Sequence, residues 1–157
     1  MSFNQFSQSL EEMHIMEQFR NRYDEFPKGK LIKSESPDFI IRNTSRISIG
    51  IELTKLHGPR VLKLKTHYPR QISGYEPPEL NRENIEFTIL AKNEKLPIYQ
   101  KKKLSQLWLL ITTDLDESPV SFNLSNKLES WNFSSEFQKV FLFELKTRKV
   151  YELKVWV

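Results

Sequence analysis

Apolar residues recur at helical spacing over residues 6–23, and polar residues fill the positions between them. This pattern predicts a first helix that packs one broad face against a core. Pro27 and Gly29 follow closely, and they predict that the helix has ended before them. The residues expected on the packed face are Leu10, Met13, Met16, Phe19 and Tyr23.

The pattern then changes to short apolar runs and to the two-residue alternation that is typical of strands. Apolar runs occupy residues 31–32 and 39–41, and an alternating run extends over residues 47–53. The polar residues 43–45 between the last two runs are typical of a turn. We therefore expect three strands that form one antiparallel unit.

Residues 57–80 hold half of the chain's four glycines and four of its eight prolines. Loops of this length are typical of functional or mobile segments. Weak alternation at residues 61–64 is compatible with one further strand. The loop also carries a basic cluster that could form a rim for a polyanion together with residues 101–103. This cluster consists of Arg60, Lys63, Lys65 and Arg70.

A second helix is predicted to begin after Asn81, a typical N-cap, with Glu83 in its first turn. Pro97 should end or kink this helix. One stripe of the helix is apolar, and Lys92 falls inside it, which is unusual for a lysine. The stripe consists of Ile85, Ile89, Leu96 and Tyr99.

The continuous apolar run at residues 107–111 fits a strand that is buried on both faces and central in the sheet. The tail predicts a short helix near residues 126–130. It also predicts two strands, at residues 140–145 and 150–156, joined by a polar turn at 146–148. We expect these two strands to form a C-terminal β-hairpin.

Composition narrows the possible chemistry. The chain has 157 residues, of which 38% are hydrophobic, so we expect one packed domain spanning residues 1–157. There is no cysteine, which excludes disulfides and thiolate metal sites. No apolar run approaches membrane-spanning length, so we expect a cytoplasmic protein without a membrane partner. The net charge of +4 suits a polyanion but does not identify one.

Two acidic residues are the strongest candidates for chemistry. Asp38 directly follows Pro37 at the start of one predicted strand, and Glu52 lies near the end of the next. Strand alternation places Glu52 on the face opposite Ile51. Gly50, on the same face as Glu52, leaves room there for a ligand or a packed helix. In a hairpin the two acids would meet at one end of the sheet, where a divalent cation can bridge them.

This order of motifs resembles the PD-(D/E)XK nuclease superfamily over roughly the first two thirds of the chain. The resemblance implies an α/β, restriction-endonuclease-like core with a central mixed β-sheet flanked by helices, in αβββαβ order. It implies that Asp38, Glu52 and the backbone carbonyl of Leu53 bind Mg²⁺ or Mn²⁺. It also implies metal-dependent hydrolysis of phosphodiesters in nucleic acid, with DNA the first expectation, and a possible homodimer.

One position departs from the family's pattern, because Thr54 stands where the motif has a lysine. Lys55 is adjacent, but alternation points it to the opposite face. Some members of the superfamily take this lysine from the following helix, which makes Lys92 the first candidate and Lys95 the second. The superfamily often brings a glutamate from a helix to the metal, so Glu12 on the packed face of the first helix is a further candidate.

Other interpretations remain open. Glu17 is the alternative to Glu12, since it lies near the edge of the same face. Asp38 could be an ordinary turn former, Glu52 a solvated residue, and Lys92 a stem along apolar surface with its ammonium in water. Thr54 suggests a nuclease-like fold without activity that binds nucleic acid or a protein. An unrelated α+β domain with Trp156 in a subunit contact is the third possibility.

Overall fold

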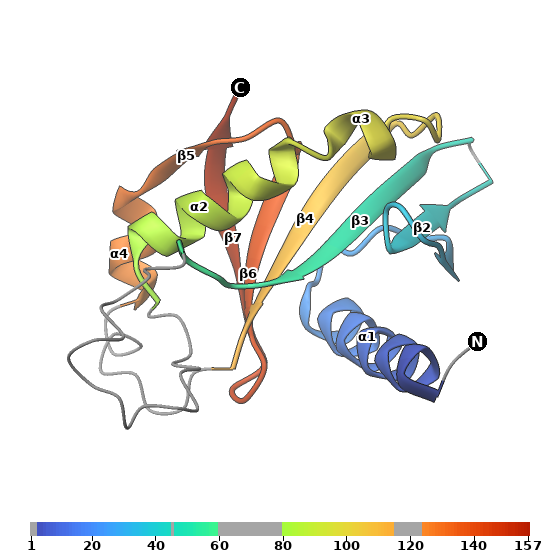
Figure 1. The fold of residues 1–157 in the computed structure, drawn as a ribbon, viewed down its shortest axis with the longest axis horizontal. Coiled ribbons are helices and arrows are strands. Elements are labelled where there is room, and N and C mark those ends of the chain that lie inside the picture. The colour runs from blue at the N-terminus through green and yellow to red at the C-terminus, as the bar shows by residue number, and fades with distance from the viewer. Residues whose placement is uncertain (1–2, 45, 60–79, 115–123) are drawn as a thin grey trace, which may run out of the picture.

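The computed structural model describes residues 3–44, 46–59, 80–114 and 124–157. These residues form a seven-stranded mixed sheet with helices on both faces (Figure 1). The helices are α1 (Phe3–Arg22), α2 (Arg82–Asn93), α3 (Leu96–Tyr99) and α4 (Leu124–Ser130). The strands are β1 (Lys30–Lys33), β2 (Phe39–Arg42), β3 (Ser48–Lys55), β4 (Gln106–Thr113), β5 (Asn132–Ser134), β6 (Lys139–Glu144) and β7 (Lys149–Trp156).

The strands lie in the order β1-β2-β3-β4-β6-β7-β5. The predicted antiparallel unit is confirmed, because β1 pairs with β2 and β2 with β3 in antiparallel fashion. β4 is central and parallel to both β3 and β6, as expected for a strand buried on both faces. β6 and β7 form the predicted C-terminal hairpin. The short edge strand β5 was not predicted.

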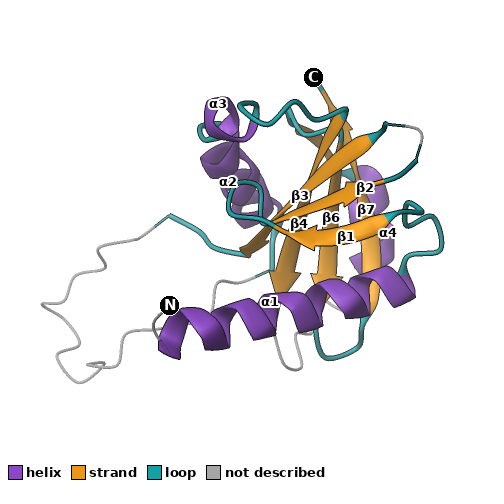
Figure 2. Cartoon of the chain, turned by 90° about the vertical axis from the view of Figure 1, so that its right-hand side faces the viewer, coloured by secondary structure: helices purple, strands orange, loops and turns teal. Residues whose placement is uncertain are grey.

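Two apolar clusters lie on the two faces of the sheet, and Figure 2 shows α1 running along one of these faces. On this face, Met16 and Phe19 of α1 pack against Phe39, Ile51 and Phe141. On the other face, α2 and α3 cover the central strands, and α4 joins the same cluster through Leu128. Since β3 lies between the two layers, both of its faces are covered.

The predicted packed face of α1 is only partly correct. Met16 and Phe19 are fully buried, and Met13 and Tyr23 are partly buried. Leu10, however, is exposed, and so is Phe6. The N-terminal end of α1 extends beyond the strands (Figure 2), so apolar positions at that end have no sheet beneath them. Helical periodicity identifies which side of a helix is apolar, but it does not show where the partner surface ends.

The second helix follows its sequence signals closely. The side chain of Asn81 accepts a hydrogen bond of 2.8 Å from the backbone N–H of Asn84, which confirms the predicted N-cap. α2 ends at Asn93, and Pro97 lies in the first turn of α3, where its missing N–H costs no hydrogen bond. The predicted apolar stripe of Ile85, Ile89, Leu96 and Tyr99 is buried.

Two sequence predictions fall on residues outside the described ranges. These are the possible strand at 61–64 and the basic cluster of Arg60, Lys63, Lys65 and Arg70. Within the described ranges, no helix has both the length and the apolar character needed to cross a membrane.

Candidate functional site

Asp38 and Glu52 lie side by side, as the hairpin arrangement predicted. In the pairing of β2 with β3, Phe39 is opposite Ile51, so one further step outward brings Asp38 opposite Glu52. The backbone N–H of Asp38 donates a hydrogen bond of 3.2 Å to Oε1 of Glu52. Strand alternation also holds, since Ile51 belongs to the apolar cluster under α1 while Glu52 faces α2 and α3.

The space beside Gly50 is filled by the protein itself. A Cβ atom at this position would lie 2.6 Å from Cγ of Pro37 and 2.6 Å from Cδ1 of Leu104. The expectation of room for a ligand or a helix is therefore wrong, because a proline ring and a leucine from the loop after α3 occupy it. Gly50 instead allows Pro37 to pack directly on β3, which fixes the backbone that carries Asp38.

The carboxylate of Asp38 is anchored to the next strand. Its Oδ2 accepts a hydrogen bond of 2.9 Å from the backbone N–H of Leu53. Pairing between β2 and β3 ends at Phe39 and Ile51, so Leu53 lies beyond the end of that ladder. The N–H and C=O groups of one strand residue leave on the same side. The carbonyl of Leu53 therefore faces the side of β3 on which Asp38 lies.

The carboxylate of Glu52 is almost completely enclosed. Its side chain is 8% exposed, and that of Lys92 is 16% exposed. The Oε2 atom of Glu52 accepts a hydrogen bond of 3.1 Å from Nζ of Lys92 and a second one from the hydroxyl of Tyr99. The interpretations of Glu52 as a solvated residue and of Lys92 as a stem with its ammonium in water are both wrong. Lys95, the second candidate for the lysine, is exposed at the start of α3.

On the other side, Asp38 lies next to a lysine that the sequence analysis missed. Nζ of Lys33, the last residue of β1, is 3.8 Å from Oδ1 of Asp38 and 3.3 Å from its backbone oxygen. Glu12 of α1 binds this ammonium at 2.7 Å. Glu12 is therefore linked to Asp38 through Lys33. Among the described residues, Glu12 forms no hydrogen bond with Asp38 or Glu52 that would mark it as a metal ligand. Glu17, the alternative to Glu12, is exposed.

The remaining positions around the motif do not replace the missing lysine. Lys55, at the end of β3, is exposed, and the hydroxyl of Thr54 donates to the backbone oxygen of Lys55 at 3.4 Å. The signal that could have found Tyr99 was its place in the stripe of Lys92 and Leu96, one turn further along. The signal that could have found Lys33 was its spacing of two residues from Leu31. Strand alternation places both on the same face of β1, and Leu31 packs in the apolar cluster under α1.

The pKa values of the two carboxyl groups are shifted in opposite directions. Burial raises the pKa of Asp38 from 3.8 to about 7, and the hydrogen bond and the charge of Glu52 add to this rise. Burial alone would also raise the pKa of Glu52, but hydrogen bonds from Asp38, Tyr99 and Lys92 outweigh it and lower that pKa. Near neutral pH, Glu52 is therefore ionised and Asp38 is in the middle of its titration.

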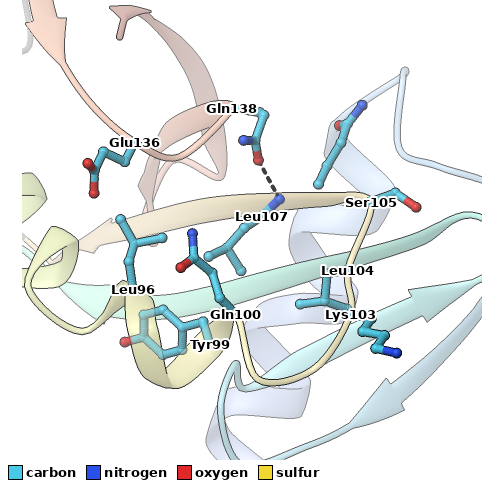
Figure 3. A pocket seen from close by; sticks show the side chains of 10 residues that line it. Leu96, Tyr99, Gln100, Lys103, Leu104, Ser105, Leu107, Glu136 and Gln138 are labelled. Carbon is cyan, nitrogen blue, oxygen red and sulfur yellow. Dashed lines mark hydrogen bonds between the residues drawn. The ribbon is translucent and has the colours of Figure 1, made fainter.

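Tyr99 is a permanent donor in this network. Burial and the neighbouring charge of Glu52 raise the pKa of its hydroxyl well above the usual range, so it remains protonated at physiological pH. The same side chain also lines an open hollow beside α3 and the start of β4 (Figure 3). The volume of this hollow is about 170 Å³. Leu104, Leu107 and Gln138 are among the other residues of this hollow, whereas Asp38 and Glu52 do not line it.

The donor set suits a hard divalent cation. Within the ranges described, no group of three or more Asp, Glu, His or Cys side chains is placed to hold a metal ion. Mg²⁺ in phosphate chemistry, however, is usually held by only one or two carboxylates, together with water and substrate oxygens. Asp38, Glu52 and the carbonyl of Leu53 meet that requirement in number and in chemical type.

Comparison of the chain with protein-family models, with curated proteins and with solved structures finds no match.

Proposed function

We propose that this chain is a metal-dependent nuclease of the PD-(D/E)XK type, with a restriction-endonuclease-like core formed by α1 to β4. The observation that carries the proposal is the position of Asp38, just before β2, beside Glu52 on the adjacent antiparallel strand β3, with the Asp38 carboxylate accepting a hydrogen bond from the N–H of Leu53. The order of elements, one helix, three antiparallel strands, a helical segment and a parallel strand, also supports it.

Each residue of the site has a defined task in this proposal. Asp38, Glu52 and the carbonyl of Leu53 hold the cation. When bound, Mg²⁺ or Mn²⁺ would lower the pKa of a water and neutralise charge on the scissile phosphate. Lys92 keeps Glu52 ionised and fixes its orientation through its hydrogen bond to Oε2.

The proposed substrate is nucleic acid, with DNA tested first. The net charge of +4 supports a polyanionic partner, because basic proteins gain affinity when bound counterions are released from nucleic acid. A cytoplasmic location and a homodimer stay predictions from the sequence. Trp156, the candidate for a subunit contact, is exposed near the C-terminus.

Cleavage assays with matched variants test the proposal. Plasmid and single-stranded DNA should be cut in the presence of Mg²⁺ or Mn²⁺, and Glu52→Gln should reduce the rate by at least about 100-fold because a metal ligand is lost. Glu152→Gln is the control, since Glu152 also contacts a tyrosine hydroxyl and a lysine, at 2.9 and 3.6 Å. Equal cutting by both variants would reject the assignment.

A second function, a nuclease-like module without activity that binds nucleic acid or a protein, is favoured by a different observation. Two glutamates at or beside the site already have lysine partners, because Lys92 pairs with Glu52 and Lys33 pairs with Glu12. Thr54 at the place of the motif lysine agrees with this function. The two functions differ in one measurable property, since only the nuclease requires a divalent cation between Asp38 and Glu52.

A further inference from the structure

Lys33 approaches the carboxylate pair from the face opposite to Lys92. In the register of β1 and β2 it lies opposite Phe39, and its ammonium is 4.8 Å from the centroid of that ring. Phe39 belongs to the apolar cluster under α1. The ammonium then reaches around the start of β2 to the backbone oxygen and Oδ1 of Asp38. The two acids therefore have one lysine on each face of the sheet.

The contacts of Lys33 differ in strength. The distance of 2.7 Å to Oε2 of Glu12 is that of a close, charge-assisted hydrogen bond, whereas 3.8 Å to Oδ1 of Asp38 is too long for a hydrogen bond. Glu12 is itself held by a hydrogen bond of 3.1 Å from the amide of Gln8. The ammonium is therefore held most closely from α1, and it makes its hydrogen bond to Asp38 at the backbone oxygen and not at the carboxylate.

The ammonium of Lys33 also has free capacity. It has three donors, and its hydrogen bonds within the described ranges go to Glu12 and to the backbone oxygen of Asp38. One donor therefore remains for a ligand. The side chain of Lys33 is 32% exposed, twice as much as the 16% of Lys92, so an anion that arrives from solvent meets Lys33 first.

From these contacts we propose that Lys33 binds a phosphate oxygen of nucleic acid beside the cation site of Asp38 and Glu52. Glu12 is then a positioning residue that acts through Lys33, and not a ligand of the cation. This proposal rests on the proposed nuclease function and deepens it, because it assigns the contact that aligns the polyanion with the two carboxylates. Lys92, by contrast, remains committed to Glu52.

The test counts phosphate contacts through the salt dependence of binding. Binding of a fluorescent DNA duplex is followed by anisotropy over a range of salt concentrations, with Ca²⁺ as the cation and the duplex checked for integrity. Each lost phosphate contact lowers the slope of log K against log salt by about 0.9. Lys33→Gln should reduce the magnitude of the slope by the equivalent of about one phosphate contact and weaken binding several-fold. Lys33→Arg should keep both the slope and the affinity of the wild type.

Two further variants separate this role from a structural one. Lys139→Gln is the matched control, because Lys139 is 33% exposed and also forms an ion pair with a glutamate. It should leave the slope unchanged. Glu12→Gln should weaken binding, but Glu12→Gln combined with Lys33→Gln should bind no more weakly than Lys33→Gln alone, since Glu12 acts through Lys33. Lys33→Met, which keeps the stem over Phe39, replaces Lys33→Gln if that variant does not fold.

The outcomes separate this proposal from the nuclease function on which it rests. Cation-dependent binding of DNA with an unchanged slope for Lys33→Gln would overturn the role of Lys33 alone. It would leave the Glu12–Lys33 pair as a structural link between α1 and β1. If the wild-type protein binds no DNA with or without Ca²⁺, both proposals fail. Additive losses for the Glu12 and Lys33 variants would overturn the positioning role of Glu12.

Discussion

Two clusters of the same composition, each with one glutamate, one lysine and one tyrosine, lie on opposite faces of the sheet. Glu52, Lys92 and Tyr99 form the first, beneath α2 and α3. The second lies on the side of α1 and comprises Glu152, Lys139 and Tyr23. In both clusters the glutamate accepts from the tyrosine hydroxyl and is paired with the lysine.

The two clusters differ in burial and in their neighbours. The side chain of Glu52 is 8% exposed and that of Glu152 is 49% exposed. Glu52 also accepts a hydrogen bond from the backbone of a second acid, Asp38. Among the described residues, no hydrogen bond or ion pair joins Glu152 to another acid. The comparison teaches that residue types alone do not make a site: enclosure and the adjacent carboxyl group set the first cluster apart.

The largest difference should appear when the lysines are removed. Lys92→Met leaves the charge of Glu52 buried without its cation, and we expect a loss of about 3–5 kcal/mol in the free energy of unfolding. Lys139→Met removes an ion pair whose glutamate is half exposed and a hydrogen bond to Tyr23, while the methionine stem can still cover the ring of Trp108, so we expect about 1 kcal/mol. Urea unfolding of both variants measures the difference. Similar losses would show that the two clusters are energetically equivalent.

Removing the tyrosine hydroxyls should give a smaller difference of the same sign. Tyr99→Phe leaves a buried carboxylate with one donor fewer, which should cost about 1–3 kcal/mol of stability. Water can replace the hydroxyl in Tyr23→Phe, because Glu152 is half exposed, so we expect about 0.5 kcal/mol. Thermal unfolding at neutral pH compares the two. A loss for Tyr23→Phe as large as that for Tyr99→Phe would contradict this view of the enclosed cluster.

The smallest effect depends on pH and belongs to the first cluster alone. Because the folded protein raises the pKa of Asp38 from 3.8 to about 7, the stability that this group contributes is complete below pH 3.8 and is lost as the pH rises through 7. Asn cannot ionise, so the free energy of unfolding of Asp38→Asn should rise relative to that of the wild type by about 1–2 kcal/mol between pH 4 and 8, allowing for partial exposure.

Chemical unfolding across this pH range measures the effect of Asp38→Asn. The contribution of Glu52 has the opposite sign. Its lowered pKa adds stability that is present above its ordinary value of 4.5 and is lost only as the pH falls through the folded pKa. The two groups therefore act in different pH windows. A stability difference between Asp38→Asn and wild type that stays constant from pH 4 to 8 would refute the raised pKa of Asp38.

Local pattern was sufficient to predict the part of the site that depends on two neighbouring strands. Alternation over β3 and the short turn after β2 determine the register, and the register places Asp38 opposite Glu52. The helical stripe that contains Lys92 also follows from local spacing. Both predictions needed only the period of each element and the order in which the elements follow.

The parts that could not be predicted depend on contacts between distant elements. Lys33 is bound both by Glu12 of α1 and by the backbone oxygen of Asp38, and no periodicity encodes the position of α1 relative to β1. The space beside Gly50 is filled by Pro37 and Leu104, whose positions follow from packing. Leu10 lies on the apolar side of α1 and is nevertheless exposed, because periodicity does not show how far the partner surface extends.

The most direct test of the account is a crystal structure of the protein soaked in Mn²⁺, with the metal located by its anomalous scattering. The account predicts one strong peak between Asp38 and Glu52, at about 2.0–2.2 Å from a carboxylate oxygen of each and from the carbonyl of Leu53. A map without a peak there, with Glu52 still bound to Lys92 and Tyr99, would contradict the proposed metal centre.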